Sequence, residues 1–308
     1  MEHNYCYMSF LTRDPYLLYT IALWHSWKEM GCRYPFKVMI TDTLGQSSID
    51  IMDKLGIEYF MVDTKEFDKI FAVSKIKPAW KECFKKLALF KQYDYDRILY
   101  LDSDTYMTKN MDCLFDSYQE GTLTCTGRWG QWKENVTKLL GGMFVLHPNE
   151  DDYNRILKLL DEILNNEHAD VKQLTPETTN DEHILSEVFK GRLNPIDQEW
   201  QYNPHPFNQR DIEWDKIALV HIATPKDKWF KEGRFINNEV KMPYSKYDYA
   251  MCYWYFNKMD NVVRLYGLDK MRDDMKILTP TDPVDMTKVE LRKPKPRKGS
   301  SDDMETLW

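Results

Sequence analysis

The sequence lacks a long hydrophobic run, since no window approaches the ~18 consecutive apolar residues that a membrane-spanning helix needs. Its first residues, 1–4, also lack the basic flank and apolar stretch of a signal peptide. We therefore expect no membrane insertion. The six cysteines are scattered without the paired spacing of a metal site, which favours reduced thiols in a cytoplasmic protein.

Basic residues are also fewer than acidic residues. The 308 residues include 42 Lys and Arg against 49 Asp and Glu, for a net charge of −7. Because a nucleic-acid-binding face has to be strongly basic, nucleic acid is not an expected partner. An acidic chain that binds a polyanionic substrate needs a local positive charge at the binding site, such as a metal ion. The ten Trp and nineteen Tyr favour a folded protein over a disordered one.

The order of apolar segments predicts an α/β fold. Over the first hundred residues, strand-like and helix-like segments alternate, which is typical of a mostly parallel sheet with crossover helices. We expect strands over 5–11, 36–41, 57–62, 97–101, 122–126, 142–146 and 216–222. We expect helices over 14–30, 49–55, 79–92, 150–165 and 181–189, the first of them with Asp14 as N-cap.

These elements indicate one domain over residues 1–280. Residues 281–308 form the expected disordered tail, because the stretch that includes 292–301 is rich in Lys, Arg and Pro and has too little apolar surface to fold. No internal repeat is visible.

Asp102 and Asp104 are the most informative residues. They follow directly after the apolar run 97–101, with Ser103 between them. Two carboxylates cannot stay inside an apolar sheet, so we place them at its rim, where open α/β sheets bind ligands. Hard carboxylate oxygens suit Mn²⁺ or Mg²⁺. Simple capping of the next segment is the other interpretation of this pair.

Five further segments occur in a characteristic order around this pair: residues 10–16, 77–87, 139–146, 179–185 and 220–229. With them the chain resembles the retaining glycosyltransferases of family 8, which contains glycogenin and the galactinol synthases. The resemblance covers roughly residues 5–230 and implies a GT-A fold. It also implies that Leu11, Thr12 and Tyr16 contact the base and ribose of a uridine nucleotide, and that Ser103 is among the residues that bind the metal and the nucleotide sugar.

Two basic positions resemble residues that bind the sugar nucleotide in this family. The resemblance implies that Lys86 reaches toward the donor sugar and phosphates, with Lys77 as a second basic group. The alternative for Lys86 is a solvated helical face shared with Lys81, Lys85 and Lys91. Gly142 is similar to the glycine that lets the backbone pass close to the sugar. Leu140 stands where the family usually has asparagine.

Asp181 and Glu182 resemble an Asp-Gln pair at the start of a helix. By that likeness Asp181 orients the donor sugar or the acceptor, and Glu182 stabilises positive charge at the reacting carbon. Helix capping explains the same carboxylates. His221 is similar to the histidine that completes the metal site with Asp102 and Asp104.

The histidine segment departs from the family pattern in two ways, and the first is that the family's glycine is absent. The second is that Asp227 stands where the family has the lysine that binds the diphosphate. Either Lys226 or Lys228 therefore takes that role, and the sequence does not choose between them.

The implied activity is metal-dependent transfer of a hexose, glucose or galactose, from a UDP-sugar with retention of configuration. Mn²⁺ or Mg²⁺ is the implied cofactor. A carbohydrate, a polyol or a protein-linked glycan is the implied acceptor. A monomer and a homodimer are both compatible with the sequence. Aromatic residues offer a stacking surface for the acceptor, with Tyr202 as one target for self-glucosylation: Trp129, Trp132, Trp200, Tyr202 and Phe207.

Three other functions remain as alternatives. A haloacid-dehalogenase-like phosphatase also places Asp-x-Asp after a strand, but usually after the first strand and with Thr or Val where Tyr106 stands here. A nucleotidyltransferase would open with a glycine-rich basic loop, which this chain lacks. A non-catalytic protein that binds a sugar or nucleotide would be expected to lose the metal ligands, and all three are present.

Overall fold

Both faces of the first strand are buried, which places it at the centre of the sheet. In β1 (Tyr5–Leu11), Tyr5 and Tyr7 enter one hydrophobic cluster, whereas Cys6 and Met8 enter another. Side chains alternate along a strand, so the two clusters lie on opposite faces. The computed structural model describes these residues: 3–72, 78–128, 131, 133–165, 179–204, 212–222, 246–274 and 284–291.

The main sheet has seven strands in the order β3-β2-β1-β4-β7-β6-β8. The strands after β1 are β2 (Phe36–Ile40), β3 (Glu58–Met61), β4 (Arg97–Leu101), β6 (Leu123–Gly127), β7 (Leu139–Leu146) and β8 (Leu193–Ile196). The first four strands are mutually parallel, as predicted. β7 runs antiparallel to both β4 and β6, and β8 is parallel to β6. The prediction missed β8.

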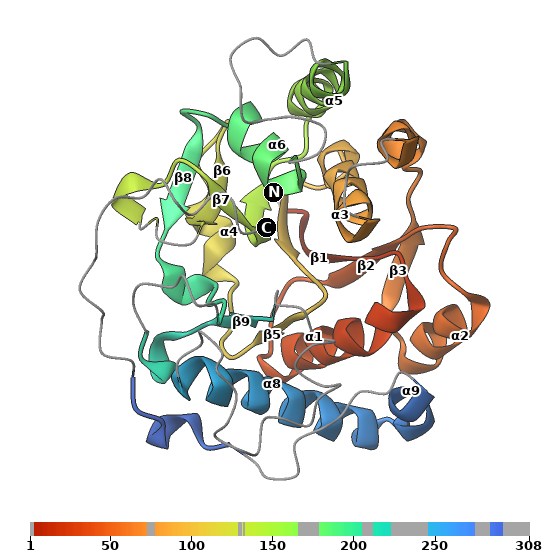
Figure 1. The fold of residues 1–308 in the computed structure, drawn as a ribbon, viewed down its shortest axis with the longest axis vertical. Coiled ribbons are helices and arrows are strands. Elements are labelled where there is room, and N and C mark those ends of the chain that lie inside the picture. Colours follow the sequence, from red (N-terminus) through yellow and green to blue (C-terminus); the bar gives the residue numbers. More distant parts are fainter. Residues whose placement is uncertain are drawn as a thin grey trace.

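Helices cover the sheet on both sides (Figure 1). One cluster of buried residues joins the sheet to α1 (Leu17–Glu29), α2 (Gln46–Leu55) and α8 (Lys246–Leu265). The other joins it to η3 (Phe84–Lys91), α5 (Glu150–Leu164) and α6 (Asp181–Val188). The result is a three-layer arrangement with a core on each face of the sheet.

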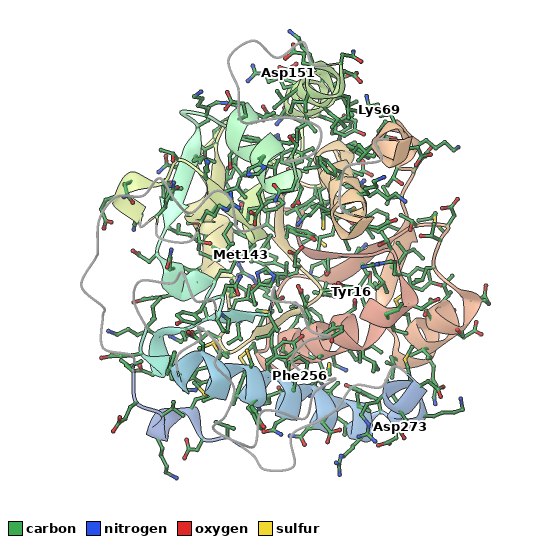
Figure 2. All side chains as sticks on the ribbon, in the orientation of Figure 1. Tyr16, Lys69, Met143, Asp151, Phe256 and Asp273 are labelled. Carbon is green, nitrogen blue, oxygen red and sulfur yellow. The ribbon has the colours of Figure 1, made fainter. Side chains whose placement is uncertain are left out.

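Helix α8 was not predicted from the sequence. It packs along α1, with the rings of Tyr255 and Phe256 centred 6.4 and 6.5 Å from that of Tyr19. Phe256, labelled in Figure 2, is almost fully buried. This contact explains why α1 is apolar over most of its surface: it is covered by the sheet on one side and by α8 on the other.

Two predicted helices differ in detail from the observed ones. Residues 14–16 form a short 3-10 helix, η1 (Asp14–Tyr16), ahead of α1. Asp14 does not cap its own helix; its Oδ1 accepts hydrogen bonds from the backbone of Gly45 (3.0 Å) and the hydroxyl of Ser48 (2.6 Å). It therefore stabilises the start of α2. The predicted helix over 79–92 is divided into α3 (Pro78–Cys83) and η3.

A second, two-stranded sheet pairs β5 (Thr105–Met107) with β9 (Leu219–His221). The strands are antiparallel, and Thr105 lies opposite His221. The strand predicted over 216–222 is shorter, because η6 (Trp214–Lys216) precedes it. The remaining short elements are η2 (Lys65–Ala72), α4 (Cys113–Ser117), η4 (Lys133–Asn135), η5 (Gln198–Trp200), α9 (Asp269–Asp274) and η7 (Met286–Lys288).

Residues 284–291 differ from the expected disordered tail. Met286 is only 3% exposed and belongs to the same cluster as α1 and α8. Asp285 begins the turn, since its Oδ1 accepts a hydrogen bond from the backbone of Thr287. Val284 and Val289 also pack against this cluster, so three apolar side chains hold the short segment, which composition alone does not reveal. Residues 281–283 and 292–308 lie outside the described residues.

Within the described residues, every helix is either too short or too polar to span a membrane. All six cysteines are free thiols.

We predict that Met286→Ala lowers the free energy of unfolding by about 2 kcal/mol, because the substitution leaves a cavity in a well-packed cluster. Leu291→Ala is the control, since Leu291 is 40% exposed, and a change within about 0.5 kcal/mol is expected there. Urea denaturation followed by circular dichroism measures both. Equal stability of Met286→Ala and the wild type would show that this segment does not contribute to the core.

Candidate active site

The site begins with a tight turn after β4. The carbonyl of Asp102 accepts hydrogen bonds from the backbone N–H of Thr105 (3.2 Å) and from its hydroxyl (2.7 Å). The backbone N–H of Asp102 donates to the carbonyl of Gly142 (2.9 Å) on the neighbouring strand β7. Both aspartates are thus fixed at the carboxyl end of β4, with Ser103 buried between them.

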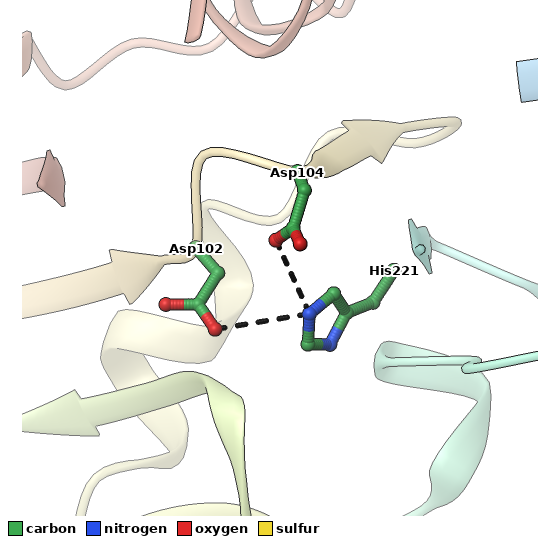
Figure 3. A group of neighbouring side chains, drawn as sticks. All are labelled: Asp102, Asp104 and His221. Atoms are coloured by element: carbon green, nitrogen blue, oxygen red, sulfur yellow. Dashed lines mark ion pairs between the residues drawn. The ribbon is translucent and has the colours of Figure 1, made fainter. Parts of the chain in front are cut away.

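His221 reaches this turn through the pairing of β5 with β9. The backbone N–H of Ile222 donates to the carbonyl of Asp104 (3.0 Å). Nε2 of His221 lies 3.3 Å from Oδ1 of Asp104 and 3.7 Å from Oδ2 of Asp102. Figure 3 shows the three side chains pointing toward one another from β4, the turn and β9. The structure therefore brings together all three predicted ligands.

The spacing of these atoms is suitable for a metal ion. One ligand atom from each residue lies within 4.8 Å of the others. Octahedral bonds of about 2.1 Å place adjacent ligand atoms about 3 Å apart and opposite ones about 4.2 Å apart. Two carboxylates and one imidazole suit Mn²⁺ better than Mg²⁺, which prefers oxygen ligands only. The residues therefore fit a divalent ion of this kind.

Lys86 connects this cluster to a second group of carboxylates. Its Nζ lies 3.1 Å from Oδ1 of Asp102 and 2.8 Å from Oδ2 of Asp181, and it donates to the carbonyl of Gly141 (3.2 Å). The residue is only 4% exposed, so the solvated-face interpretation is wrong for Lys86 and for its buried neighbour Lys85. Burial alone would lower the pKa of Lys86, but Asp102 and Asp181 raise it well above its ordinary value. Lys86 is therefore a cation.

Asp181 and Glu182 occupy the first turn of α6. The N-cap of this helix is Asn180, whose Oδ1 accepts a hydrogen bond from the backbone of His183 (3.0 Å). The two carboxylates are therefore not needed as the cap. Burial raises the pKa of Asp181, and the charge of Lys86 opposes this rise.

Glu182 is held by two neighbours. Its Oε1 accepts a hydrogen bond from the backbone of Gly141 (2.8 Å), and its Oε2 lies 3.8 Å from Nε of Arg128. Burial raises the pKa of its carboxyl group, while the guanidinium of Arg128 lowers it. These contacts fix both carboxylates beside the Gly141–Gly142 backbone.

Negative charge predominates among these groups, with four carboxylates and two cations: Asp102, Asp104, Asp181, Glu182, Lys86 and Arg128. Like charges gathered at one place repel one another unless a cation is added. A divalent ion would balance the two excess negative charges.

Gly142 has a steric role that the sequence did not indicate. A Cβ atom at this position would lie 2.3 Å from Cε1 and Nδ1 of His221, and 2.4 Å from Nε2 of Gln201. Only glycine leaves room for the imidazole and amide to pack against β7.

The expected uridine segment lies beside the metal cluster. β1 and β4 are adjacent and parallel, so residues 11–16 and the aspartate turn are at the same edge of the sheet. The side chain of Leu11 is in the core, which leaves only its main chain for a ligand. Thr12 is buried as well, and its carbonyl accepts a hydrogen bond from Thr43 (2.8 Å). Tyr16 is half-buried.

Several predicted residues lie outside the described residues: Lys77, Lys226, Lys228, Trp129, Trp132 and Phe207. Trp200 packs against the core, and Tyr202 is buried within it. The hydroxyl of Tyr202 donates to Oδ1 of Asp248 (3.1 Å), also buried. Tyr202 is therefore neither a stacking surface nor an accessible acceptor for self-glucosylation.

Sequence reasoning missed three residues that touch the site. The hydroxyl of Tyr100 donates to Oδ1 of Asp102 (2.5 Å). Its position two residues before Asp102, on the same face of the strand, was a usable signal. Arg128 and Gln201 meet the site only through tertiary folding, and no local pattern marks them.

Comparison with known proteins identifies the family. The chain matches the model of Glycosyl transferase family 8 over residues 7–232, and it belongs to this family. Glycogenin of Neurospora crassa is 26% identical over 234 residues, which are 74% of this chain and 32% of that protein. Galactinol synthase 1 of Solanum lycopersicum is 28% identical over 192 residues, which are 53% of this chain and 55% of that protein.

Glucose N-acetyltransferase 1 of Candida glabrata is a further relative. It is 29% identical over 122 residues, which are 36% of this chain and 24% of that protein. The chain thus spans less than two thirds of the length of these curated relatives.

Solved structures agree on the fold. The galactosyltransferase LgtC, in complex with donor and acceptor sugar analogues, superposes with a TM-score of 0.52 at 15% identity, covering 74% of this chain and 90% of that one. The bifunctional glycosyltransferase WbbM gives a TM-score of 0.58 at 13% identity, covering 87% of this chain and 52% of that one. These likenesses confirm the predicted α/β fold of the GT-A type.

We predict that Gly142→Ala weakens Mn²⁺ binding by at least ~10-fold, because the new methyl group displaces the imidazole of His221. Calorimetric titration with Mn²⁺ measures the Kd. Gly45→Ala is the control, since an added Cβ there meets only the carboxylate of Asp14. A wild-type Kd for Gly142→Ala would mean that His221 is not a ligand or that β7 moves to accept the methyl group.

Proposed function

We propose that this chain is a retaining glycosyltransferase that moves a hexose from a UDP-sugar to a hydroxyl acceptor, using Mn²⁺ or a similar ion held by Asp102, Asp104 and His221. The convergence of these three side chains at the rim of the sheet is the observation that supports the proposal most strongly. Membership of family 8 supports the reaction class.

For the donor we propose UDP-glucose or UDP-galactose. The names of two relatives, glycogenin and galactinol synthase, and the galactosyltransferase title of LgtC support a hexose of this kind. The acceptor is a carbohydrate, a polyol or a protein-linked glycan. The six free thiols are consistent with a cytoplasmic protein. For the oligomeric state we propose either a monomer or a homodimer.

The residues of the site have different roles in such a reaction. A divalent ion bound by the Asp-Asp-His cluster would neutralise the charge that develops on the departing diphosphate. Lys86 lies between that cluster and Asp181, so its ammonium group links the diphosphate side to the sugar side of the site. Ser103 lies within the aspartate turn, where we propose that it faces the diphosphate. We propose that the segment with Leu11, Thr12 and Tyr16 holds the uridine.

Retention requires that the acceptor attack from the face that the diphosphate leaves. The leaving group itself can then accept the proton of the acceptor hydroxyl. We propose that Asp181 orients the sugar and that Glu182 stabilises positive charge at the reacting carbon, since both carboxylates are fixed beside Gly141. We also propose Lys77, together with Lys226 or Lys228, as further phosphate contacts.

We predict slow hydrolysis of UDP-glucose or UDP-galactose without acceptor, and only with Mn²⁺ or a similar ion present. Release of UDP, measured by a coupled assay, should stop when excess chelator is added and return with Mn²⁺. Equal turnover with and without chelator would show that the reaction does not require a metal ion.

The same assay tests the ligands one by one. Asp102→Asn, Asp104→Asn and His221→Ala should each reduce turnover by at least ~100-fold, or about 3 kcal/mol of transition-state stabilisation. Asp151→Asn and His147→Ala are matched controls, because both side chains are exposed and neither belongs to the cluster. Near-full activity of His221→Ala would contradict its role as a ligand.

A further prediction concerns stereochemistry. The product formed from an α-linked UDP-sugar should keep the α configuration, because we propose that Asp181 and Glu182 act beside the sugar and assign no residue as a base for inversion. The anomeric coupling in the proton NMR spectrum of the first product distinguishes the two outcomes. A β-linked product would contradict the roles given to both carboxylates.

The phosphatase alternative loses its basis, because the chain belongs to glycosyl transferase family 8. A non-catalytic sugar-binding protein would bind free sugar without Mn²⁺ and would not turn over a UDP-sugar. The assays above therefore separate it from the proposed transferase.

A further inference from the structure

Gln201 makes a buried hydrogen-bond chain behind the proposed metal site. Its Nε2 lies 2.9 Å from Nδ1 of His221, and its Oε1 accepts a hydrogen bond from the hydroxyl of Thr126 (3.0 Å). Gln201 is only 1% exposed and Thr126 is fully buried. The backbone of Gly142 closes the space around the amide and the imidazole. His221 therefore has a fixed partner on the side of the ring that faces away from the aspartates.

This arrangement determines which ring nitrogen holds the proton. An amide nitrogen only donates, so Nδ1 of His221 accepts and the neutral ring has its proton on Nε2. Nε2 is the atom that faces Asp102 and Asp104. The described arrangement thus suits the chain without an ion, since an N–H group there can donate to the carboxylates.

Metal binding at Nε2 requires the other tautomer. The proton then belongs on Nδ1, and the partner of Nδ1 has to be an acceptor. Rotation of the Gln201 amide by half a turn presents Oε1 to Nδ1 and Nε2 to Thr126. The threonine hydroxyl can accept as readily as it donates, so every group keeps a partner in both states.

We propose that Gln201, supported by Thr126, is the positioning residue for the metal ligand His221. We propose further that the Gln201 amide rotates by half a turn when the ion binds. This role rests on the proposed function, since it requires a metal at His221. Gln201 does not contact the metal or the substrate; it acts through the orientation and the tautomer of the imidazole.

Calorimetric titration with Mn²⁺ alone tests the proposal. Gln201→Met keeps the length of the side chain and removes both polar atoms, and the Kd should rise by about 10- to 100-fold. Gln201→Glu keeps an acceptor for Nδ1 and should bind Mn²⁺ at least as tightly as the wild type. Thr126→Val should raise the Kd less than Gln201→Met. The double variant should resemble Gln201→Met alone, because the two residues form one chain.

Gln198→Met is the matched control, since Gln198 donates to the carbonyl of Gln131 (2.9 Å) rather than to His221. Its Kd should equal that of the wild type. Thermal unfolding of each variant shows that the chain is folded at the temperature of the titration.

Nitrogen-15 NMR of the metal-free chain gives a readout that does not depend on the ion. The His221 ring should have its proton on Nε2 in the wild type, whereas Nδ1 should be protonated in Gln201→Glu. A wild-type ring with its proton on Nδ1, or unchanged Mn²⁺ affinity in Gln201→Met, would overturn the role of Gln201. If the wild-type chain itself does not bind Mn²⁺, the proposed function fails, which is a different result.

Discussion

The candidate site depends on the pairing of two very short strands. Thr105 lies opposite His221 in the β5–β9 ladder, and this register alone brings an imidazole from late in the chain to the aspartate turn. A shift by one residue would turn His221 away from the carboxylates, because successive side chains of a strand point to opposite faces. The core that supports β5 and β9 therefore also fixes the geometry of the site, and α8 is part of that core.

Lys86 is the second constraint. Buried charges are tolerated when each is paired, and Lys86 satisfies this rule by contacting Asp102, Asp181 and a backbone carbonyl at once. The contact joins the carboxyl end of β4 to the start of α6. The Asp-Asp-His cluster and the Asp181–Glu182 pair are consequently two halves of one polar site rather than separate features.

Much of this organisation could be predicted from local patterns. The run 97–101 followed by Asp102 and Asp104 indicated a strand that delivers carboxylates to the sheet rim, and the structure confirms it. The apolar run of β1 and the amphipathic pattern of α5 also gave nearly the observed bounds. In these places the local sequence and the tertiary contacts favour the same structure.

The remainder depends on contacts between distant segments. The buried position of Lys86 was not evident from a lysine-rich helix, because only the carboxylates of other elements make its burial tolerable. The link between Gln201 and His221 joins the residue after η5 to the last residue of β9, 20 positions further along the chain, and follows no local period. Residues 105–107 are too few to be identified as a strand before their partner β9 is known.

The central claim is that one divalent ion is held jointly by Asp102, Asp104 and His221. A crystal of the chain grown with Mn²⁺ and UDP, measured at the manganese absorption edge, tests it most directly. The account predicts an anomalous peak about 2.2 Å from a carboxylate oxygen of each aspartate and from Nε2 of His221, with the diphosphate on its open side. A manganese peak elsewhere, or UDP bound in this crystal without manganese at the cluster, would contradict the account.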